Sequence, residues 1–318
     1  MTAKNTDLPD ATLAAKLGAR VTGQAPSSVT RFTTGARHYV YDVQFAAHSP
    51  LVVRIGDRSA HAEMAGAAHL SRLLRPLGVP LPALLAEDVS AELPWLVLER
   101  LPGTDLAAVI ASMLPEQLDL IAAGVATAQR IVANTGSAGR YGYAVRPEQA
   151  PLAAWSDVLM ANLVRSRGRI AAAGLFEVKV ADALDALLVS AHGRLDAVEA
   201  TPFLHDTTTK NVIIGSGGAL SGIVDIDDLC FGDPRYPAAL TLAVLQGYGG
   251  PVSYVSAWLR HAGAVDDPTF RLYVALFLLD LMAEHGQVSN GNQQPSSPDA
   301  RAALLREFEA ALRLARDG

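Results

Sequence analysis

The stretch of sequence that decides the fold runs from residue 204 to residue 227 and reads LHDTTTKNVIIGSGGALSGIVDID. It holds two apolar β segments, Val212–Ile214 and Leu220–Ile226, joined by a turn of small residues. This pattern predicts an antiparallel hairpin, in which the start of the first strand lies beside the end of the second. We therefore expect Asn211 and Asp225 at the same open end of the hairpin, with Asp206 one short loop before them.

Asp206, Asn211 and Asp225 are side chains that suit phosphoryl transfer. The transition state spreads negative charge over phosphate oxygens, so Mg²⁺ must be held beside them by hard oxygen ligands. A carboxylate and an amide are such ligands, which favours Asn211 and Asp225 as the metal site. A separate carboxylate must accept the proton of the attacking hydroxyl, and Asp206 suits that role. Asp227 lies two residues after Asp225, on the same face of the expected strand, where it could meet a metal or the substrate.

Upstream and downstream of this hairpin the sequence pattern differs. The first hundred residues favour short strands and one helix, at Ser28–Phe32, Tyr39–Phe45, Leu51–Ile55, Ala60–Leu74 (the helix) and Leu93–Glu99. Beyond them, alanine-rich stretches with helical spacing dominate, at roughly 105–134, 151–172, 177–198, 235–248, 251–262, 268–286 and 298–316. The sequence therefore predicts an α+β protein, with a small antiparallel-sheet lobe at residues 1–100 and a larger, mostly helical lobe at 101–318.

Composition excludes several classes of protein. The 318 residues carry a net charge of −6, which gives no electrostatic footprint for nucleic acid. Mean hydropathy is +0.21, but the longest apolar run, Leu272–Leu279, is shorter than the ~20 residues that a membrane helix needs. No apolar signal core stands at the N-terminus, and the single cysteine, Cys230, excludes an intramolecular disulfide. We expect a soluble cytoplasmic protein that binds neither nucleic acid nor membranes, with its oligomeric state open.

The order of these motifs resembles the aminoglycoside phosphotransferase and choline kinase-like family, which is related to protein kinases. Members show an Asp followed five residues later by Asn, then an apolar-apolar-Asp segment, an acidic residue and Gly-Asp-Pro. This chain has Asp206 and Asn211 at that spacing, then Ile223–Asp227, then Gly232-Asp233-Pro234. The resemblance extends over most of the chain and implies a two-lobed protein-kinase-like fold that binds ATP and Mg²⁺.

The resemblance also implies a nucleotide site in the first hundred residues. Arg54 would stand on the strand that carries the nucleotide lysine, with Glu63 as its helix partner. Glu99 and Leu101 would belong to the adenine-binding hinge, and Gly35 to the turn that covers the phosphates. Arginine in place of lysine is one departure from the family pattern, because its planar fork differs from an ammonium.

A second departure concerns the catalytic loop. Leu204 occupies the position of the usual histidine, and His205 directly precedes the base. This leaves open which contact orients the loop, and whether His205 packs, donates a hydrogen bond or meets the substrate. Asp233 is interpreted as a structural residue, because Gly-Asp-Pro is typical of a turn in which Asp bonds its own backbone.

Two functions of different classes remain from the sequence. The leading hypothesis is an ATP- and Mg²⁺-dependent kinase that phosphorylates a hydroxyl group of a small molecule, with GTP not excluded. The alternative is a nucleotide-binding pseudokinase with a regulatory role, which the retained base and metal ligands disfavour. A protein kinase is disfavoured because Gly232-Asp233-Pro234 follows Asp225 too closely for a long activation segment. The acceptor stays open among choline-like alcohols, amino sugars, nucleosides and antibiotics.

Overall fold

The chain folds into two compact units. The first comprises Met1–Pro102, Val224–Asp228 and Val288–Asn292; the second comprises Gly103–Ile223, Leu229–Gln287 and Gln293–Gly318. The computed structural model describes residues 8–32, 38–289, 292–293 and 296–316. Among these residues, no helix has both the length and the apolar character required to cross a membrane.

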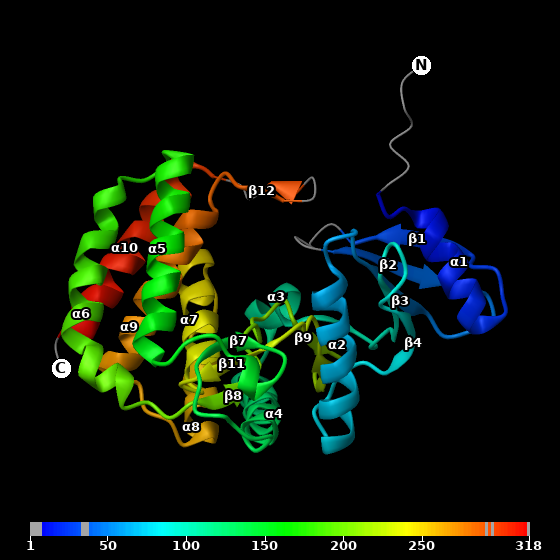
Figure 1. The fold of residues 1–318 in the computed structure, drawn as a ribbon, viewed down its shortest axis with the longest axis horizontal. Helices are drawn as coiled ribbons and strands as arrows, with labels where there is room; N and C mark the ends of the chain where they lie inside the picture. Colours follow the sequence, from blue (N-terminus) through cyan, green and yellow to red (C-terminus); the bar gives the residue numbers. More distant parts are fainter. Residues whose placement is uncertain (1–7, 33–37, 290–291, 294–295, 317–318) are drawn as a thin grey trace. The chain divides into compact units, whose positions relative to one another are not determined.

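The first unit is built on a five-stranded antiparallel sheet with the strand order β1-β2-β3-β5-β4 (Figure 1). Its strands are β1 (Ser28–Arg31), β2 (Tyr39–Gln44), β3 (Leu51–Ile55), β4 (Leu84–Asp88) and β5 (Trp95–Glu99). Two helices accompany it, α1 (Ala11–Thr22) and α2 (His61–Leu74), with the 3₁₀ turn Arg75–Leu77 after α2. Helix α1 was not expected from the sequence; Asp10 caps it by accepting a 2.8 Å hydrogen bond from the backbone N–H of Leu13.

Alternation along the central strand β3 separates its two faces. Leu51, Val53 and Ile55 are buried in one apolar cluster with residues of α1. A second apolar cluster, on α2 and β5, contains Met64 and Leu96. Because successive strand side chains point to opposite faces, Arg54 lies on the face away from α1. The sheet thus places a buried cation beside polar groups of its own unit.

The second unit is mostly helical. Its helices are α3 (Leu106–Val109), α4 (Pro115–Ala133), α5 (Trp155–Ala173), α6 (Asp182–Asp196), α7 (Tyr236–Tyr248), α8 (Ser253–Ala262), α9 (Pro268–Glu284) and α10 (Pro298–Arg316). The expected helix at 105–134 is divided, because a 3₁₀ turn at Ile110–Ser112 precedes Pro115, which begins a new helix. Short 3₁₀ turns also stand at Pro147–Gln149 and Val178–Ala181.

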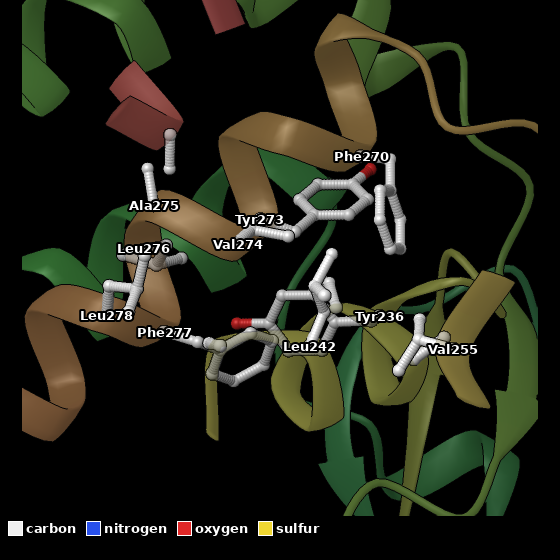
Figure 2. Close-up of a cluster of buried hydrophobic side chains, with 14 of the residues drawn as sticks. Tyr236, Leu242, Val255, Phe270, Tyr273, Val274, Ala275, Leu276, Phe277 and Leu278 are labelled. Carbon is white, nitrogen blue, oxygen red and sulfur yellow. The ribbon is translucent and has the colours of Figure 1, made fainter. Parts of the chain in front are cut away.

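Helix α9 forms the centre of the helical core. It packs against α5, α7 and α10, and most of its side chains are buried all round (Figure 1). The rings of Tyr236 and Phe277 lie 4.3 Å apart, and Tyr273 stands edge-on to Tyr236 at 5.4 Å (Figure 2). The aromatic residues of the last third of the chain are therefore largely core, as such a uniformly apolar helix predicts.

Two three-stranded sheets complete the second unit. One has the order β10-β9-β6 and consists of β6 (Thr104–Asp105), β9 (Val212–Ile214) and β10 (Leu220–Ile223). The other has the order β7-β11-β8 and consists of β7 (Gly142–Ala144), β8 (Thr201–Phe203) and β11 (Leu229–Gly232). Two-residue strands β12 (Val288–Ser289) and β13 (Asn292–Gln293) pair with each other.

The antiparallel hairpin of β9 and β10 is confirmed, with Val212 opposite Ile223. Strand β6 joins its other edge directly after Gly103, whose φ of 112° suits glycine. A Cβ atom at Gly103 would lie only 1.9 Å from the carbonyl oxygen of Ile214, so no other residue fits there. The expected α+β architecture, a small antiparallel sheet followed by a larger helical region, is confirmed.

Candidate active site

Asp206 and Asn211 lie on one short loop between β8 and β9 in the second unit. The Thr208 hydroxyl donates a 2.8 Å hydrogen bond to Oδ1 of Asp206. Nδ2 of Asn211 donates a 3.1 Å hydrogen bond to the backbone carbonyl of Asp206. The loop is therefore closed on itself, and it brings together the two residues that the sequence assigned to the base and the metal.

Asp225 belongs to the first unit, while Asp206 and Asn211 belong to the second. Strand β10 ends at Ile223, two residues before Asp225, and β9 begins directly after Asn211. Within the second unit the register therefore sets the end of β10 beside the start of β9, as the hairpin predicted. The joint action of all three residues stays a prediction.

The expectation that Asp225 and Asp227 share a strand face is wrong. The strand does not continue past Ile223, and Asp225 has a φ of 64°, in the left-handed region that few residues other than glycine adopt. Strand alternation therefore does not apply to the segment that holds the two carboxylates. Such a backbone is strained for aspartate and persists where neighbouring contacts fix it.

Three carboxylates and a histidine gather around the buried Arg54 in the first unit. Nη2 of Arg54 lies 2.6 Å from Oδ2 of Asp227 and 3.3 Å from Oδ1 of Asp225. Nε2 of His38 lies 3.3 Å from Oδ2 of Asp227 and 3.6 Å from Oε2 of Glu63. We call these five residues, His38, Arg54, Glu63, Asp225 and Asp227, the Arg54 cluster. In it, the guanidinium of Arg54 and the imidazole of His38 each lie between two carboxylates.

Burial and pairing oppose each other in the pKa values of the Arg54 cluster. Burial alone would raise the pKa of Asp227, but the charge of Arg54 and the polar contacts with His38 and Arg54 hold it well below its usual range. Burial alone would lower the pKa of Arg54, but Asp227 and Asp225 raise it above its ordinary value. The mutual attraction of Arg54 and Asp227 therefore favours the charged form of both groups despite their burial.

Several buried atoms of the Arg54 cluster remain without a hydrogen-bond partner among the described residues. They are Oδ1 of Asp227, Nε of Arg54 and Nδ1 of His38. A spare carboxylate oxygen is the kind of ligand that Mg²⁺ takes, and a spare guanidinium N–H is the kind of donor that phosphate takes. The residues present thus fit a nucleotide bound with its metal, since buried polar atoms otherwise find partners.

The other expected nucleotide residues have these positions. Oε2 of Glu99 accepts a 3.0 Å hydrogen bond from the backbone N–H of Ala83. The carbonyl of Leu101 accepts a 2.9 Å hydrogen bond from Nη1 of Arg100. Gly35 lies outside the described residues. Contact of Glu99 and Leu101 with a nucleotide stays a prediction.

Sequence reasoning missed His38. It is only 4% exposed, directly before β2, where it stands between Glu63 and Asp227. A histidine at the start of a strand carries no spacing signal, and its partners come from segments far along the chain. Only the fold reveals it.

A second group of charges surrounds Asp206 in the second unit. Glu284, at the end of α9, exposes part of its surface to solvent. The protein atoms around its carboxylate nevertheless remove water from it, and this burial, together with the negative charge of Asp280, raises its pKa. Asp206 raises it further, while Arg169 and Lys210 lower it. We call Arg169, Asp206, Lys210, Asp280 and Glu284 the Glu284 cluster. Arg169, Lys210 and Glu284 form no hydrogen bond or ion pair with other residues in the described part of the chain.

Asp280 differs from Glu284 because both of its oxygens have partners. Oδ1 accepts a 2.7 Å hydrogen bond from the buried Ser166, and Oδ2 lies 3.6 Å from Nη2 of Arg165. Glu284 instead combines a raised pKa with no ion-pair partner among the described residues. Glu284 carries no sequence signal, since it is one acid at the end of a long helix.

Two further residues have structural surroundings. The ring of His205 stands edge-on to the ring of Tyr143, 5.1 Å away, so His205 packs against β7. Asp233 is buried, and its Oδ1 accepts a 2.9 Å hydrogen bond from the backbone N–H of Arg235. Its Oδ2 also accepts a 2.9 Å hydrogen bond from Tyr273. The structural interpretation of Asp233 is confirmed.

Comparison with known protein families gives a match over most of the chain. The model of the phosphotransferase enzyme family, APH, matches residues 28–273. No curated protein matches the chain.

Three solved structures share the fold. A thermostable mutant of aminoglycoside phosphotransferase APH(4)-Ia, in a ternary complex with AMP-PNP and hygromycin B, aligns over 96% of this chain and 99% of its own, at 17% identity and a TM-score of 0.65. The GDP and kanamycin complex of APH(2")-IIia aligns over 96% and 97%, at 16% identity and 0.66. A putative fructosamine-3-kinase from Thermobifida fusca aligns over 94% and 98%, at 20% identity and 0.62.

Proposed function

Because this chain belongs to the phosphotransferase enzyme family, we propose that it transfers the γ-phosphate of ATP, with Mg²⁺, to a hydroxyl group of a small molecule. The observation that carries the proposal is the state of Asp206. Thr208 holds its carboxylate through Oδ1, whereas Oδ2 forms no hydrogen bond among the described residues. A carboxylate fixed on one side and available on the other suits a general base.

Asp206 and the other candidate residues have separate roles in the proposed phosphate transfer. Asp206 orients the acceptor hydroxyl and takes its proton as the oxygen attacks phosphorus. Asn211 and Asp225 hold the metal, and Asp227 contributes its spare oxygen to the metal or to a metal-bound water. When bound, Mg²⁺ neutralises charge on the phosphate oxygens.

The nucleotide is assigned to the first unit. Arg54 offers a buried guanidinium already aligned by Asp227 and Asp225, and its spare Nε–H can bind a phosphate oxygen. Glu63, Glu99, Leu101 and Gly35 complete the proposed site. Complexes of similar folds with AMP-PNP and with GDP support a purine nucleotide, and GTP stays an alternative to ATP. Residues 1–100 would thus form the nucleotide lobe and 101–318 the catalytic and substrate lobe, acting in the cytoplasm.

The acceptor is assigned to the surface of the Glu284 cluster. Its side chains lie within electrostatic reach of the base and carry both signs of charge. An acceptor with polar or charged substituents would relieve the repulsion among Asp206, Asp280 and Glu284. The similar folds were solved in complexes with hygromycin B and with kanamycin, two different compounds, so the fold alone does not select the acceptor.

Magnesium-dependent release of ADP from ATP, measured across a panel of hydroxyl compounds, tests the function. We expect Asp206→Ala to abolish transfer while nucleotide binding, followed by calorimetry, stays near wild type. Full-rate phosphorylation by Asp206→Ala would show that the assigned base is wrong. Nucleotide binding without turnover of any compound, and with no effect of Asp206→Ala, would instead favour the pseudokinase alternative.

A further inference from the structure

A buried glutamine on α4 contacts the backbone next to Asp206. Gln129 is only 7% exposed, and its neighbours on the helix, Val125, Ala126 and Val132, are apolar and buried. A polar side chain on such a face is costly unless it finds hydrogen-bond partners. The hydrogen-bond partners of Gln129 indicate its role, because they lie on the loop that carries Asp206.

The Gln129 amide is saturated by the loop that carries the base. Oε1 accepts a 3.0 Å hydrogen bond from the backbone N–H of Leu204. Nε2 donates a 2.8 Å hydrogen bond to the carbonyl of Leu204 and a 3.2 Å hydrogen bond to the Thr207 hydroxyl. The amide thus pairs with Leu204 as a neighbouring strand would, directly beyond the end of β8.

Other elements of the second unit hold the same loop farther along. The Thr241 hydroxyl, on α7, lies 3.4 Å from the carbonyl of Thr207. The backbone N–H of Ala107, on α3, donates a 3.0 Å hydrogen bond to the carbonyl of Thr209. These contacts fix the loop after Asp206, whereas Gln129 bonds both polar backbone atoms of Leu204, two residues before it.

We propose that Gln129 is a positioning residue that sets the direction of the Asp206 carboxylate. The side chain of Leu204 is apolar and buried, so it offers no polar contact of its own to orient the loop. Two residues flanking the His205-Asp206 pair, Leu204 and Thr207, are tied to one rigid amide on a long helix. This inference rests on the proposed function of Asp206 as base.

Gln129→Met tests the proposal, because methionine fills the same volume without an amide. Without the hydrogen bonds from the Gln129 amide, Asp206 is misplaced. We therefore expect kcat for ATP hydrolysis, with water as the acceptor, to fall by about 10²-fold. The KM for Mg²⁺-ATP should stay within about threefold of wild type, since nucleotide contacts lie elsewhere. Thr207→Val removes only the third contact and should lower kcat by about threefold.

Hydrogen exchange gives a readout that needs no turnover. In Gln129→Met the amides of residues 204–208 should lose protection while those of α5 and α9 keep theirs, which also verifies folding. The matched control is Gln246→Met on α7, because the buried Gln246 Oε1 has no partner among the described residues. That variant should leave both kcat and the loop's protection unchanged.

Three outcomes would overturn the proposal, and a fourth concerns the proposed base. If the amides of residues 204–208 keep their exchange protection in Gln129→Met, Gln129 does not hold the loop. If they lose protection but kcat is unchanged, Gln129 does not position Asp206. A fall in kcat equal to that of Gln246→Met also overturns the proposal. Equal hydrolysis by wild type and Asp206→Asn would instead contradict the proposed base, while the exchange data still decide whether Gln129 holds the loop.

Discussion

The two charged clusters of this protein are organised in opposite ways. In the Arg54 cluster a buried cation and a buried histidine each lie between two carboxylates. In the Glu284 cluster three carboxylates lie near one another, and Arg169 and Lys210 form no ion pair in the described part of the chain. The first arrangement is built before any ligand arrives; the second is incomplete without one. Their response to removal of a charge should therefore differ in sign.

The largest expected effect comes from removing the cation of the Arg54 cluster. Arg54→Met leaves Asp227 buried without its principal counterion, which should destabilise the first unit by about 3–5 kcal/mol. Urea denaturation measures this cost, with Arg58→Met as the control, because Arg58 forms its ion pair at the surface. Equal effects of the two substitutions would contradict the view that buried pairing stabilises this cluster.

A buried network in the second unit sharpens the comparison, since it pairs opposite charges as Arg54 and Asp227 do in the first unit. Asp233 binds Arg235 through both carboxylate oxygens and accepts a hydrogen bond from Tyr273. Asp233→Asn removes the charge but keeps the shape, and we expect a loss of about 2 kcal/mol in the free energy of unfolding. An unchanged free energy of unfolding in Asp233→Asn would mean that charge pairing does not predict stability in the second unit.

A half-exposed carboxylate should give an intermediate effect that depends on pH. Asp267 caps α9 by accepting a 2.8 Å hydrogen bond from the backbone N–H of Phe270, and Asp267→Ala should cost about 1 kcal/mol at neutral pH. Burial opposes ionisation, but the backbone hydrogen bond from Phe270 and the pairing with Arg235 lower the pKa of Asp267. A lowered carboxyl pKa adds stability above the unfolded value, and this stability is lost as pH falls through the folded value.

The difference between wild type and Asp267→Ala should consequently shrink in strongly acidic solution. Denaturation curves at neutral and acidic pH test this directly. A difference that stays constant across the pH range would show that the cap acts without its charge.

The smallest effect should have the opposite sign. Burial and the charge of Asp280 raise the pKa of Glu284, so ionised Glu284 costs stability above that pKa, and the cost disappears as pH falls through it. Because the side chain is exposed, solvent screening limits the effect, and Glu284→Gln should stabilise the protein by only a few tenths of a kcal/mol at neutral pH. Glu309→Gln, on the exposed face of α10, should change nothing. A destabilised Glu284→Gln would remove the contrast between the two clusters.

Local patterns predicted much of the fold. Strand β3 was predicted with its observed bounds, and β9 and β10 follow the expected hairpin, because strand alternation and turn residues act over a few positions. The break at Pro115 and helix α1 were not predicted, since both depend on where a helix gains tertiary packing. Asp225 and Asp227 were placed on a strand face because the apolar run gives no sign of the left-handed turn that ends it.

The candidate site was predictable only where its residues are close in the sequence. Asp206 and Asn211 meet through a short loop, so their spacing was sufficient to bring them together. His38, Gln129 and Glu284 were missed, because each owes its role to partners far along the chain. A single histidine, glutamine or glutamate has no distinctive pattern of neighbours in the sequence. Its role can be inferred only from the partners that it contacts in the folded structure.

The contact between Gln129 and Leu204 also has a consequence for how the protein reaches its active form. The two residues are 75 positions apart, so the hydrogen bonds form only after a long segment has closed. Contacts of such sequence separation are made late relative to helices, which appear within microseconds. During refolding, far-ultraviolet circular dichroism should therefore recover before catalysis does. The time at which turnover recovers would then mark the last packing step of the helical region during refolding.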